Sequence, residues 1–212
     1  DLKNPLDEVI EPRATQEEMT NFIETELTES LKGLPTRTTQ FGRFDKGLAY
    51  TILMKYYMHE KNWAKAEECG RELLKAEYGY GLMDRYADIF TLENEGNKEI
   101  IFACTEERGT NLQLWHDHAL PGNYPTKNAS IQKWDGYKVP WPFYRTFEEG
   151  DDRLSVLVGE YVGTDGVLFN EESDIAKHGN LYSGAVPVKY GEDPESTGDG
   201  SQIDLVVYRY AD

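Results

Sequence analysis

The stretch from Arg43 to Glu77 constrains the fold of this chain most, because it contains two runs of apolar residues at helical spacing. In the first run, which ends near Glu60, the apolar residues fall on two faces of the helix. One stripe consists of Tyr50, Leu53 and Tyr57, and the other of Ala49, Ile52 and Tyr56. A helix that is wet on one face shows a single apolar stripe, so this helix is expected to lie between two neighbours.

The second run begins after a break at residues 61–62 and extends to about residue 77. Small residues at Ala66 and Gly70 would let the two helix backbones approach closely. The packing positions of both runs have the spacing of a tetratricopeptide helix pair: Tyr50, Leu53, Tyr57, Trp63 and Ala66. Two positions depart from that pattern, since Met54 stands where a small residue is usual and Gly70 where an aromatic residue is usual. Such pairs bury a continuous core only by stacking on further helices.

A further helix is predicted from residue 16 to residue 31. Thr15 and Glu18 have the spacing of a capping box, and Gly33 and Pro35 end the pattern. The apolar stripe of this helix consists of Met19, Phe22, Ile23, Leu27 and Leu31. Residues 1–14 are expected to be extended, because the prolines at positions 5 and 12 disfavour a helix before them.

The helical period fades beyond residue 80. The run NKEIIFACTEE predicts a strand, DRYADIF a short helical turn, and PFYRTFEEGD one or two helical turns. Segments 107–142 and 159–202 have no steady period. The expected fold class is therefore mainly α with a minor α+β part: tetratricopeptide-like helix pairs, a long irregular aromatic-rich region and a few short strands. We expect one domain over residues 1–212, with a helical scaffold at 16–80 and an irregular ligand-binding region at 81–212.

The charge of the chain excludes some partners. A net charge of −17, from 39 acidic against 22 basic residues, repels phosphate backbones and anionic bilayers, so nucleic acid is not expected as a partner. The sequence has no apolar run long enough to span a membrane. Cys69 and Cys104 are the only cysteines, and their spacing leaves one disulfide or two free thiols open.

No sequence motif assigns catalysis, since the G-x-S-x-G, P-loop and G-x-G-x-x-G patterns are absent. Adjacent acids such as Glu148-Glu149 are typical of a solvated surface rather than of the spaced pair in a glycosidase. His116 and His118 would share one face of a strand, but no third ligand follows at a fixed spacing. This favours two surface histidines over a metal site. We therefore expect no catalytic residue, no metal and no cofactor.

An aromatic-rich loop is the strongest candidate for a binding site. Three tryptophans and three tyrosines fall within about thirty positions, interleaved with Asn, Gln and Asp residues. The C–H bonds of a pyranose ring pack on an aromatic face, and its hydroxyl groups need planar polar partners; aromatic rings also lose little rotamer entropy on binding. The alternative is that the rings fill a small core under the loop. The candidate ligand-binding residues are Trp115, Asn123, Tyr124, Trp134, Tyr137 and Trp141.

Four blocks of the sequence, in the same order, resemble the SusD/RagB family of outer-membrane glycan-binding lipoproteins and cover most of residues 40–212. The first is the helix pair, GRFDKGLAYTILMKYYMHEKNWAKAEECGRELL. The second, YGYGLMDRYADIFTLENEGNKEIIFACTEE, is similar to a tyrosine run, a short helix and an Asn-x-Glu-Ile-Ile-Phe strand in the family. VPWPFYRTFEEGDDRL resembles its helix ending in Asp-x-Arg, and VPVKYGEDPESTGDGSQIDLVVYRYAD its lysine-containing strand, loop and Arg-Tyr-Ala-Asp.

The resemblance implies a protein that captures oligosaccharides or polysaccharides at the cell surface without cleaving them. Such proteins cover a SusC-like TonB-dependent transporter and are held at the outer membrane by a lipid anchor. By this resemblance, the anchor and the first helices are expected upstream of this sequence, and Arg-Tyr-Ala-Asp is expected to begin a long helix, as it does in the family. The resemblance thus implies a partial SusD-like domain with exposed apolar helix faces, which would favour self-association. Binding residues vary across the family, so the candidate site rests on composition alone.

Two other functions remain open from the sequence. In one, the helix pair is a tetratricopeptide-type scaffold that binds a peptide, and the aromatic residues form a core. In the other, the chain is a secreted glycoside hydrolase that uses acidic residues near the aromatic loop.

Overall fold

The computed structural model describes residues 12–175, 177 and 179–212. The extended segment predicted for residues 1–14 lies outside the described residues at positions 1–11. The chain divides into two compact units. The helical unit consists of the residues up to Thr38 together with Phe44–Tyr78, and the mixed unit consists of Thr39–Arg43 and Gly79–Asp212.

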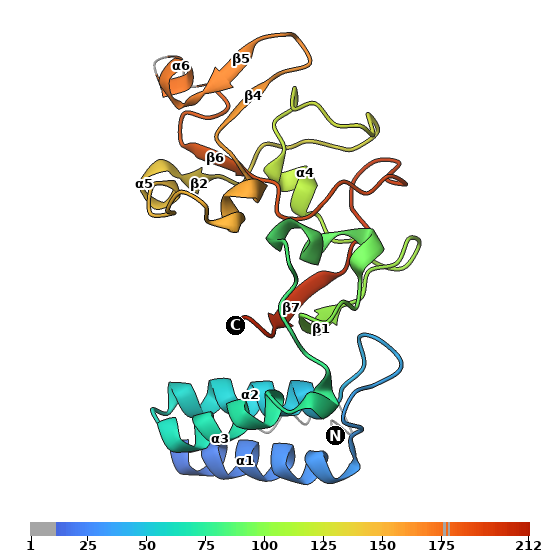
Figure 1. Cartoon of the computed structure of the whole chain (residues 1–212), viewed down its shortest axis with the longest axis vertical. Coiled ribbons are helices and arrows are strands. Elements are labelled where there is room, and N and C mark those ends of the chain that lie inside the picture. The colour runs from blue at the N-terminus through green and yellow to red at the C-terminus, as the bar shows by residue number, and fades with distance from the viewer. Residues whose placement is uncertain (1–11, 176, 178) are drawn as a thin grey trace. The chain divides into compact units, whose positions relative to one another are not determined.

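The helical unit contains three α-helices: α1 at Gln16–Gly33, α2 at Lys46–His59 and α3 at Trp63–Leu73 (Figure 1). A short 3-10 turn at Ala76–Tyr78 follows. The predicted capping box is confirmed, since the side chain of Thr15 accepts from the backbone N–H of Glu18, and the Glu18 carboxylate accepts from the backbone N–H of Thr15. Asp45 and Asn62 are the N-cap residues of α2 and α3. The side chain of Asp45 accepts from the backbone N–H of Leu48, and that of Asn62 accepts from the backbone N–H of Lys65.

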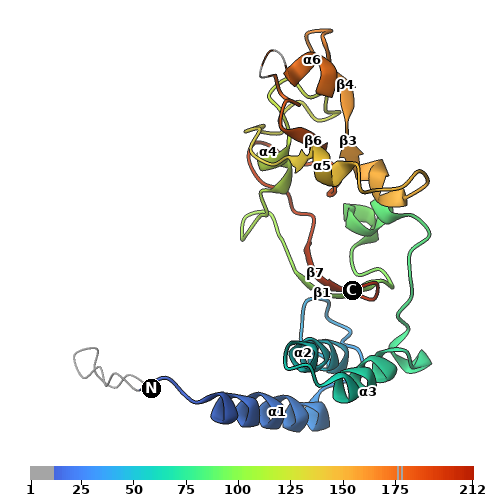
Figure 2. The same ribbon diagram turned by 90° about the vertical axis from the view of Figure 1, so that its left-hand side faces the viewer.

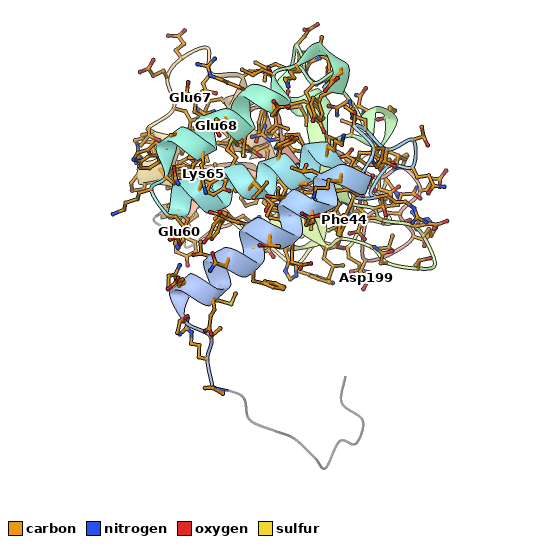
Figure 3. All side chains as sticks on the ribbon, turned by 90° about the horizontal axis from the view of Figure 1, so that it is seen from below. Phe44, Glu60, Lys65, Glu67, Glu68 and Asp199 are labelled. Carbon is orange, nitrogen blue, oxygen red and sulfur yellow. The ribbon has the colours of Figure 1, made fainter. Side chains whose placement is uncertain are left out.

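The core of the helical unit confirms that α2 is apolar on more than one side. Leu53 and Tyr57 of α2 are buried against Ala66 and Cys69 of α3, and Leu27 and Leu31 of α1 pack on the same cluster. In Figure 3, α1, α2 and α3 run in similar directions, and Lys65, labelled there on α3, forms an ion pair with Glu24 of α1 at 3.0 Å. Met19 and Phe22 of α1 are exposed, at 42% and 60%.

The contact between α2 and α3 explains the two departures from the tetratricopeptide pattern. A Cβ atom placed on Gly70 would lie 3.4 Å from the sulfur of Met54, so the long side chain fills the space that the glycine leaves. Compared with the tetratricopeptide pattern, the large residue of this contact lies on α2, as Met54, and the small residue lies on α3, as Gly70. One packing assignment was wrong: Trp63 is the first residue of α3 and is 62% exposed.

Replacing Gly70 by Phe is expected to destabilise the helical unit by about 1–3 kcal/mol, because a ring cannot fit beside the Met54 sulfur without displacing it. The double variant Met54→Ala/Gly70→Phe should recover part of that loss, since it restores space for the ring. Urea denaturation followed by circular dichroism measures the free energy of unfolding of each variant. Met58 lies on the same helix and is 49% exposed, so Met58→Ala in place of Met54→Ala should recover nothing. Equal recovery from both would show that Met54 and Gly70 are not matched in size.

The mixed unit is built from short strands and short helices. The predicted strand is confirmed as β1, Ile100–Cys104, which pairs antiparallel with β7, Leu205–Arg209. A second sheet has the strand order β2–β6–β3, where β2 is Val139–Pro140, β6 is Gly184–Pro187 and β3 is Leu157–Val158. A third, two-stranded sheet is a hairpin of β4, Glu160–Val162, and β5, Leu168–Asn170. The helices are α4 at Trp115–Ala119, α5 at Trp141–Tyr144 and α6 at Glu171–Ile175, with 3-10 turns at Tyr86–Phe90, Leu92–Asn94 and Asp152–Val156.

The fold class predicted from the sequence is confirmed: helices predominate, and the strands form small sheets (Figures 1 and 2). The turn predicted at DRYADIF and the helix predicted after residue 140 are both present. The helix α4, inside the segment expected to be irregular, was not predicted. Its five residues are too few to show a helical period in the sequence.

Two apolar clusters fill the mixed unit. The α4–β6 cluster contains Ala119, Leu120, Ile131, Trp141, Tyr161, Leu181, Ala185 and Val186, and the β1–β7 cluster contains Ile89, Phe90, Ile100, Ala103, Tyr190 and Ile203. Trp115 packs against both clusters. Glycine is required where β2 meets β6, because a Cβ atom on Gly184 would lie 2.1 Å from the carbonyl oxygen of Val139.

The C-terminal run IDLVVYRYAD completes the first sheet. Its apolar part forms β7, and Arg209 at the end of β7 forms an ion pair with the buried Glu99 at 3.3 Å. The backbone N–H of Tyr210 donates to the carbonyl oxygen of Glu99. Cys69 is buried in the helical unit and Cys104 is exposed in the mixed unit, and both are free thiols. Burial raises the pKa of Cys69 to about 11.

Candidate functional site

The helix α4 is the centre of the candidate site. The side chain of Gln113 accepts a hydrogen bond from the backbone N–H of Trp115, which satisfies one free donor at the start of the helix. Because the segment is helical, alternate residues point to different sides, so the prediction that His116 and His118 share one strand face was wrong. His116 is 3% exposed rather than a surface residue, whereas His118 is only partly buried.

The loop of residues 134–137 is held by the carbonyl groups at the end of α4. The last four carbonyl groups of a helix lack partners within it and accept from other groups. Here the backbone N–H of Trp134 donates to Asp117 at 2.6 Å, and that of Asp135 donates to Leu120 at 3.1 Å. Residues 136 and 137 both donate to the carbonyl oxygen of His118. This pairing fixes the loop on the helix.

Three rings meet where the loop lies on α4, and we name His118, Trp134 and Tyr137 the aromatic platform. The rings of His118 and Tyr137 stack with centroids 4.9 Å apart, and Trp134 meets His118 edge to face at 4.9 Å. Trp134 is 45% exposed and Tyr137 is 43% exposed. Two of the predicted ligand-binding residues, Trp134 and Tyr137, are therefore exposed, and both contact the ring of His118.

Polar groups lie beside the aromatic platform. Asp135, which follows Trp134 in the chain, forms an ion pair with Lys138. Gln132 is exposed two residues before Trp134, and its backbone N–H donates to the carbonyl oxygen of Gly198. These groups can supply hydrogen bonds to the hydroxyl groups of a ligand that packs on the rings.

The structure places two of the predicted tryptophans away from the aromatic platform surface. Trp141 is 7% exposed inside the α4–β6 cluster, and its indole N–H donates to the carbonyl oxygen of Leu181 at 2.9 Å. Trp115 is partly buried between the two clusters and donates to the carbonyl oxygen of Pro187. Both indoles have an internal partner, as buried tryptophans usually do. Trp115 still supports the platform, because its ring contacts Tyr137 at 5.5 Å.

Asn123 and Tyr124 belong to a separate internal network. The side-chain oxygen of Asn123 accepts from the hydroxyl of Tyr161 at 2.9 Å and from the amide of Asn180 at 2.8 Å. The ring of Tyr124 lies 5.0 Å from that of Tyr161, and burial raises the pKa of Tyr124. These two side chains are already committed to partners within the mixed unit. The sequence did not distinguish them from exposed residues, because polar residues in loops look alike whether they bind a ligand or each other.

His118 is the residue that the sequence analysis did not assign to the site. From the sequence it was predicted, together with His116, to be a surface histidine, with a metal site as the alternative. Among the described residues, no group of three His, Cys, Asp or Glu side chains is placed to hold a metal ion. Its position between two tryptophans in the sequence was the available signal, but only the helical turn of α4 brings its ring between Trp134 and Tyr137.

Replacement of Trp141 by Ala is expected to cost about 3–5 kcal/mol of unfolding free energy, because it empties a core position. Trp134→Ala should change the stability by about 0.5 kcal/mol or less, since that ring is near the surface. Chemical denaturation of the two variants beside the wild type gives both values. Similar losses from both substitutions would contradict the different burial of the two indoles.

A buried polar pair lies on the inner side of α4. The Nε2 atom of His116 is 3.5 Å from a carboxylate oxygen of Asp117, and the same oxygen accepts from the backbone N–H of Gly200. Burial lowers the pKa of His116 and raises the pKa of Asp117. The carboxylates of Asp193 and Glu192 also act on His116 from the neighbouring loop and favour its charged form. Burial has the larger effect, so the neutral imidazole is favoured in the folded chain.

The lowered pKa of His116 predicts acid sensitivity. The unfolded chain takes up this proton more readily, with a pKa of about 6.5, so the contribution to stability is complete above that pH and is lost as the pH falls toward the folded-state pKa. The raised pKa of Asp117 acts in the opposite direction, because the folded chain takes up this proton at a higher pH than the unfolded chain does, and this gain in stability is complete once the pH falls below about 3.9. Between about pH 7 and 5, His116→Gln should therefore lose less stability than the wild type in urea denaturation. His59→Gln, at an exposed position, is the control and should follow the wild type; identical curves for all three would contradict the assignment.

The comparisons with known proteins show which fold this is. No family model and no curated protein matches the sequence. A SusD superfamily protein from Parabacteroides distasonis ATCC 8503 matches 96% of this chain and 46% of its own, at 18% identity and a TM-score of 0.70. Surface glycan-binding protein A from Bacteroides thetaiotaomicron, in complex with laminarihexaose, matches 92% of this chain and 47% of its own, at 19% identity and a TM-score of 0.68.

Surface glycan-binding protein A from Bacteroides uniformis also matches, over 94% of this chain and 44% of its own, at 18% identity and a TM-score of 0.70. The chain thus spans less than half the length of each of these structures. At 18–19% identity, the similarity concerns the fold alone. For the fold, the resemblance predicted from the four sequence blocks is confirmed. Over the part that it spans, this chain has the same fold as these SusD superfamily and SusD-like structures.

Proposed function

We propose that this chain binds oligosaccharides or polysaccharides on the aromatic platform without cleaving them. The observation that carries the proposal is the pair of exposed rings, Trp134 and Tyr137, fixed on α4 beside polar groups. Rings held in place before binding lose little conformational entropy when a sugar packs on them. The similar structure from Bacteroides thetaiotaomicron contains laminarihexaose, which makes a neutral β-glucan the first ligand to test.

The charge of the chain supports a neutral ligand on this surface. With a net charge of −17, an acidic glycan would be repelled at a distance, whereas a neutral one would not. The binding energy must then come from ring contacts and hydrogen bonds rather than from ion pairs. Affinity for a neutral glycan should accordingly depend little on salt concentration.

The wider role is also part of the proposal. By resemblance, the complete protein would stand at the outer-membrane surface on a lipid anchor and deliver glycan to a SusC-like TonB-dependent transporter. No helix in the described part of the chain is long and apolar enough to cross a membrane. The structures of this fold named as glycan-binding proteins support a binding function over hydrolysis.

Affinity electrophoresis in a gel that contains laminarin tests the binding function. The wild type should be retarded, and Trp134→Ala should lose most of the retardation, because it removes one of the two exposed rings on which the glycan would pack. Trp63→Ala is the matched control, since it removes an exposed tryptophan of the helical unit. It should migrate like the wild type.

Three outcomes would contradict the proposal. Trp134→Ala and Trp63→Ala could lower retardation equally, which would indicate nonspecific contact with exposed rings. The wild type could fail to be retarded by laminarin and by a panel of other neutral glycans. It could also release reducing sugar from the polysaccharide, which would favour the hydrolase alternative.

A further inference from the structure

We propose a second binding site in the mixed unit, for a sugar or small molecule that carries a protonated amine. The site is a surface cavity of about 530 Å³ that is widely open to solvent, and Glu160 and Glu172 in its lining are exposed. Its lining residues come from α5, β4, the end of β5 and the start of α6, and none of them belongs to the aromatic platform. Its lining consists of Trp141, Tyr144, Gly159, Glu160, Asn170, Glu171 and Glu172.

One wall of the cavity is aromatic. The rings of Trp141 and Tyr144 meet edge to face with centroids 5.4 Å apart. Gly159 lets the chain pass close to them, because a Cβ atom there would lie 3.1 Å from the Tyr144 hydroxyl. Trp141, predicted from the sequence as a ligand-binding residue, contributes to this wall from a buried position. An aromatic wall attracts a cation as well as the C–H groups of a sugar.

The other walls carry excess negative charge. Arg145 pairs with Glu171, and the amide of Asn170 donates to the carboxylate of Glu160 at 3.1 Å. Glu172 accepts no hydrogen bond and forms no ion pair with the residues that the structure describes. The three carboxylates of the lining thus have one ion pair among them, that of Glu171 with Arg145.

The stabilisation of α6 by acidic residues in its first turn does not account for all three glutamates of the cavity lining. Acidic side chains in the first turn stabilise a helix, which explains Glu171 and Glu172 at the start of α6. It does not explain Glu160, which reaches the same cavity from β4. Like charges gathered around one cavity repel each other, and a cation bound among them relieves that repulsion.

The combination of an aromatic wall and uncompensated carboxylates selects one class of ligand. A protonated amine can lie against the ring of Tyr144 and pair with the carboxylates, while the remaining hydroxyl groups of an amino sugar can bond to Asn170. A uronic acid would be repelled. An N-acetylated sugar has the same ring but no charge, so it would lose the ion pairs.

Isothermal titration with the fully deacetylated glucosamine trimer, at about pH 6, tests the site, since the amines are then protonated and glutamates remain charged. The trimer should bind the wild type at least about tenfold more tightly than its N-acetylated counterpart. Binding should weaken with salt. Glu172→Gln and Glu160→Gln should each weaken it by about tenfold, because both keep the shape of the side chain and remove its charge.

Controls separate this site from the aromatic platform. Glu148→Gln removes an exposed carboxylate outside the cavity lining and should leave binding of the glucosamine trimer unchanged. Trp134→Ala should also leave binding of the glucosamine trimer unchanged. Glu172→Gln should leave the binding of laminarihexaose unchanged, and that result would also show that the Glu172→Gln variant is folded. Equal affinity for the charged and acetylated trimers, or an equal effect of Glu148→Gln and Glu172→Gln, would overturn the proposal. The proposal also fails if the wild type does not bind the glucosamine trimer, whatever its affinity for laminarihexaose.

Discussion

The candidate site depends on the free carbonyl groups at the end of α4. A helix of five residues leaves most of its hydrogen-bonding groups without internal partners. The carbonyl groups of Asp117 and His118 in α4 and of Leu120 directly after it accept four backbone N–H groups from residues 134–137. Asp117 and Gly200 join the other side of the helix to the loop that precedes β7. Short elements that could not be stable alone are thus held by hydrogen bonds to each other, and the rings of the aromatic platform take their positions from that network.

Burial divides the aromatic residues into two groups with different tasks. Trp115 and Trp141 fill the apolar clusters and satisfy their N–H groups with backbone carbonyls. Trp134 and Tyr137 lie outside those clusters and keep much of their ring surface exposed. Both interpretations considered for the aromatic-rich loop, a core and a binding surface, therefore apply, but to different residues.

The sequence predicted the helical unit closely because its signals are local. The capping residues Thr15 and Glu18, the two-sided α2 and the break at residues 61–62 all act within a few positions of the chain. It also predicted β1 from its apolar run. It missed α4, and it placed Trp63 in a packing position that the structure leaves exposed.

The limits of prediction at the site have a physical cause. Whether a tryptophan is buried depends on segments far away in the chain, such as the Leu181 carbonyl that accepts from Trp141 across forty residues. Composition identifies an aromatic-rich loop but contains no information about such partners. For the same reason Asn123 was indistinguishable from a ligand-binding amide until Tyr161 and Asn180 were seen beside it.

Oxidation of the four tryptophans by N-bromosuccinimide, with the product at each position identified by mass spectrometry, tests the central claim most directly. In the free protein, Trp63 and Trp134 should react fast and Trp141 slowly, following their exposed fractions of 62%, 45% and 7%. Laminarihexaose should slow the oxidation of Trp134 and leave that of Trp63 unchanged. Protection of both tryptophans to the same extent, or no protection of Trp134 by a glycan that the protein binds, would contradict a sugar site on the aromatic platform.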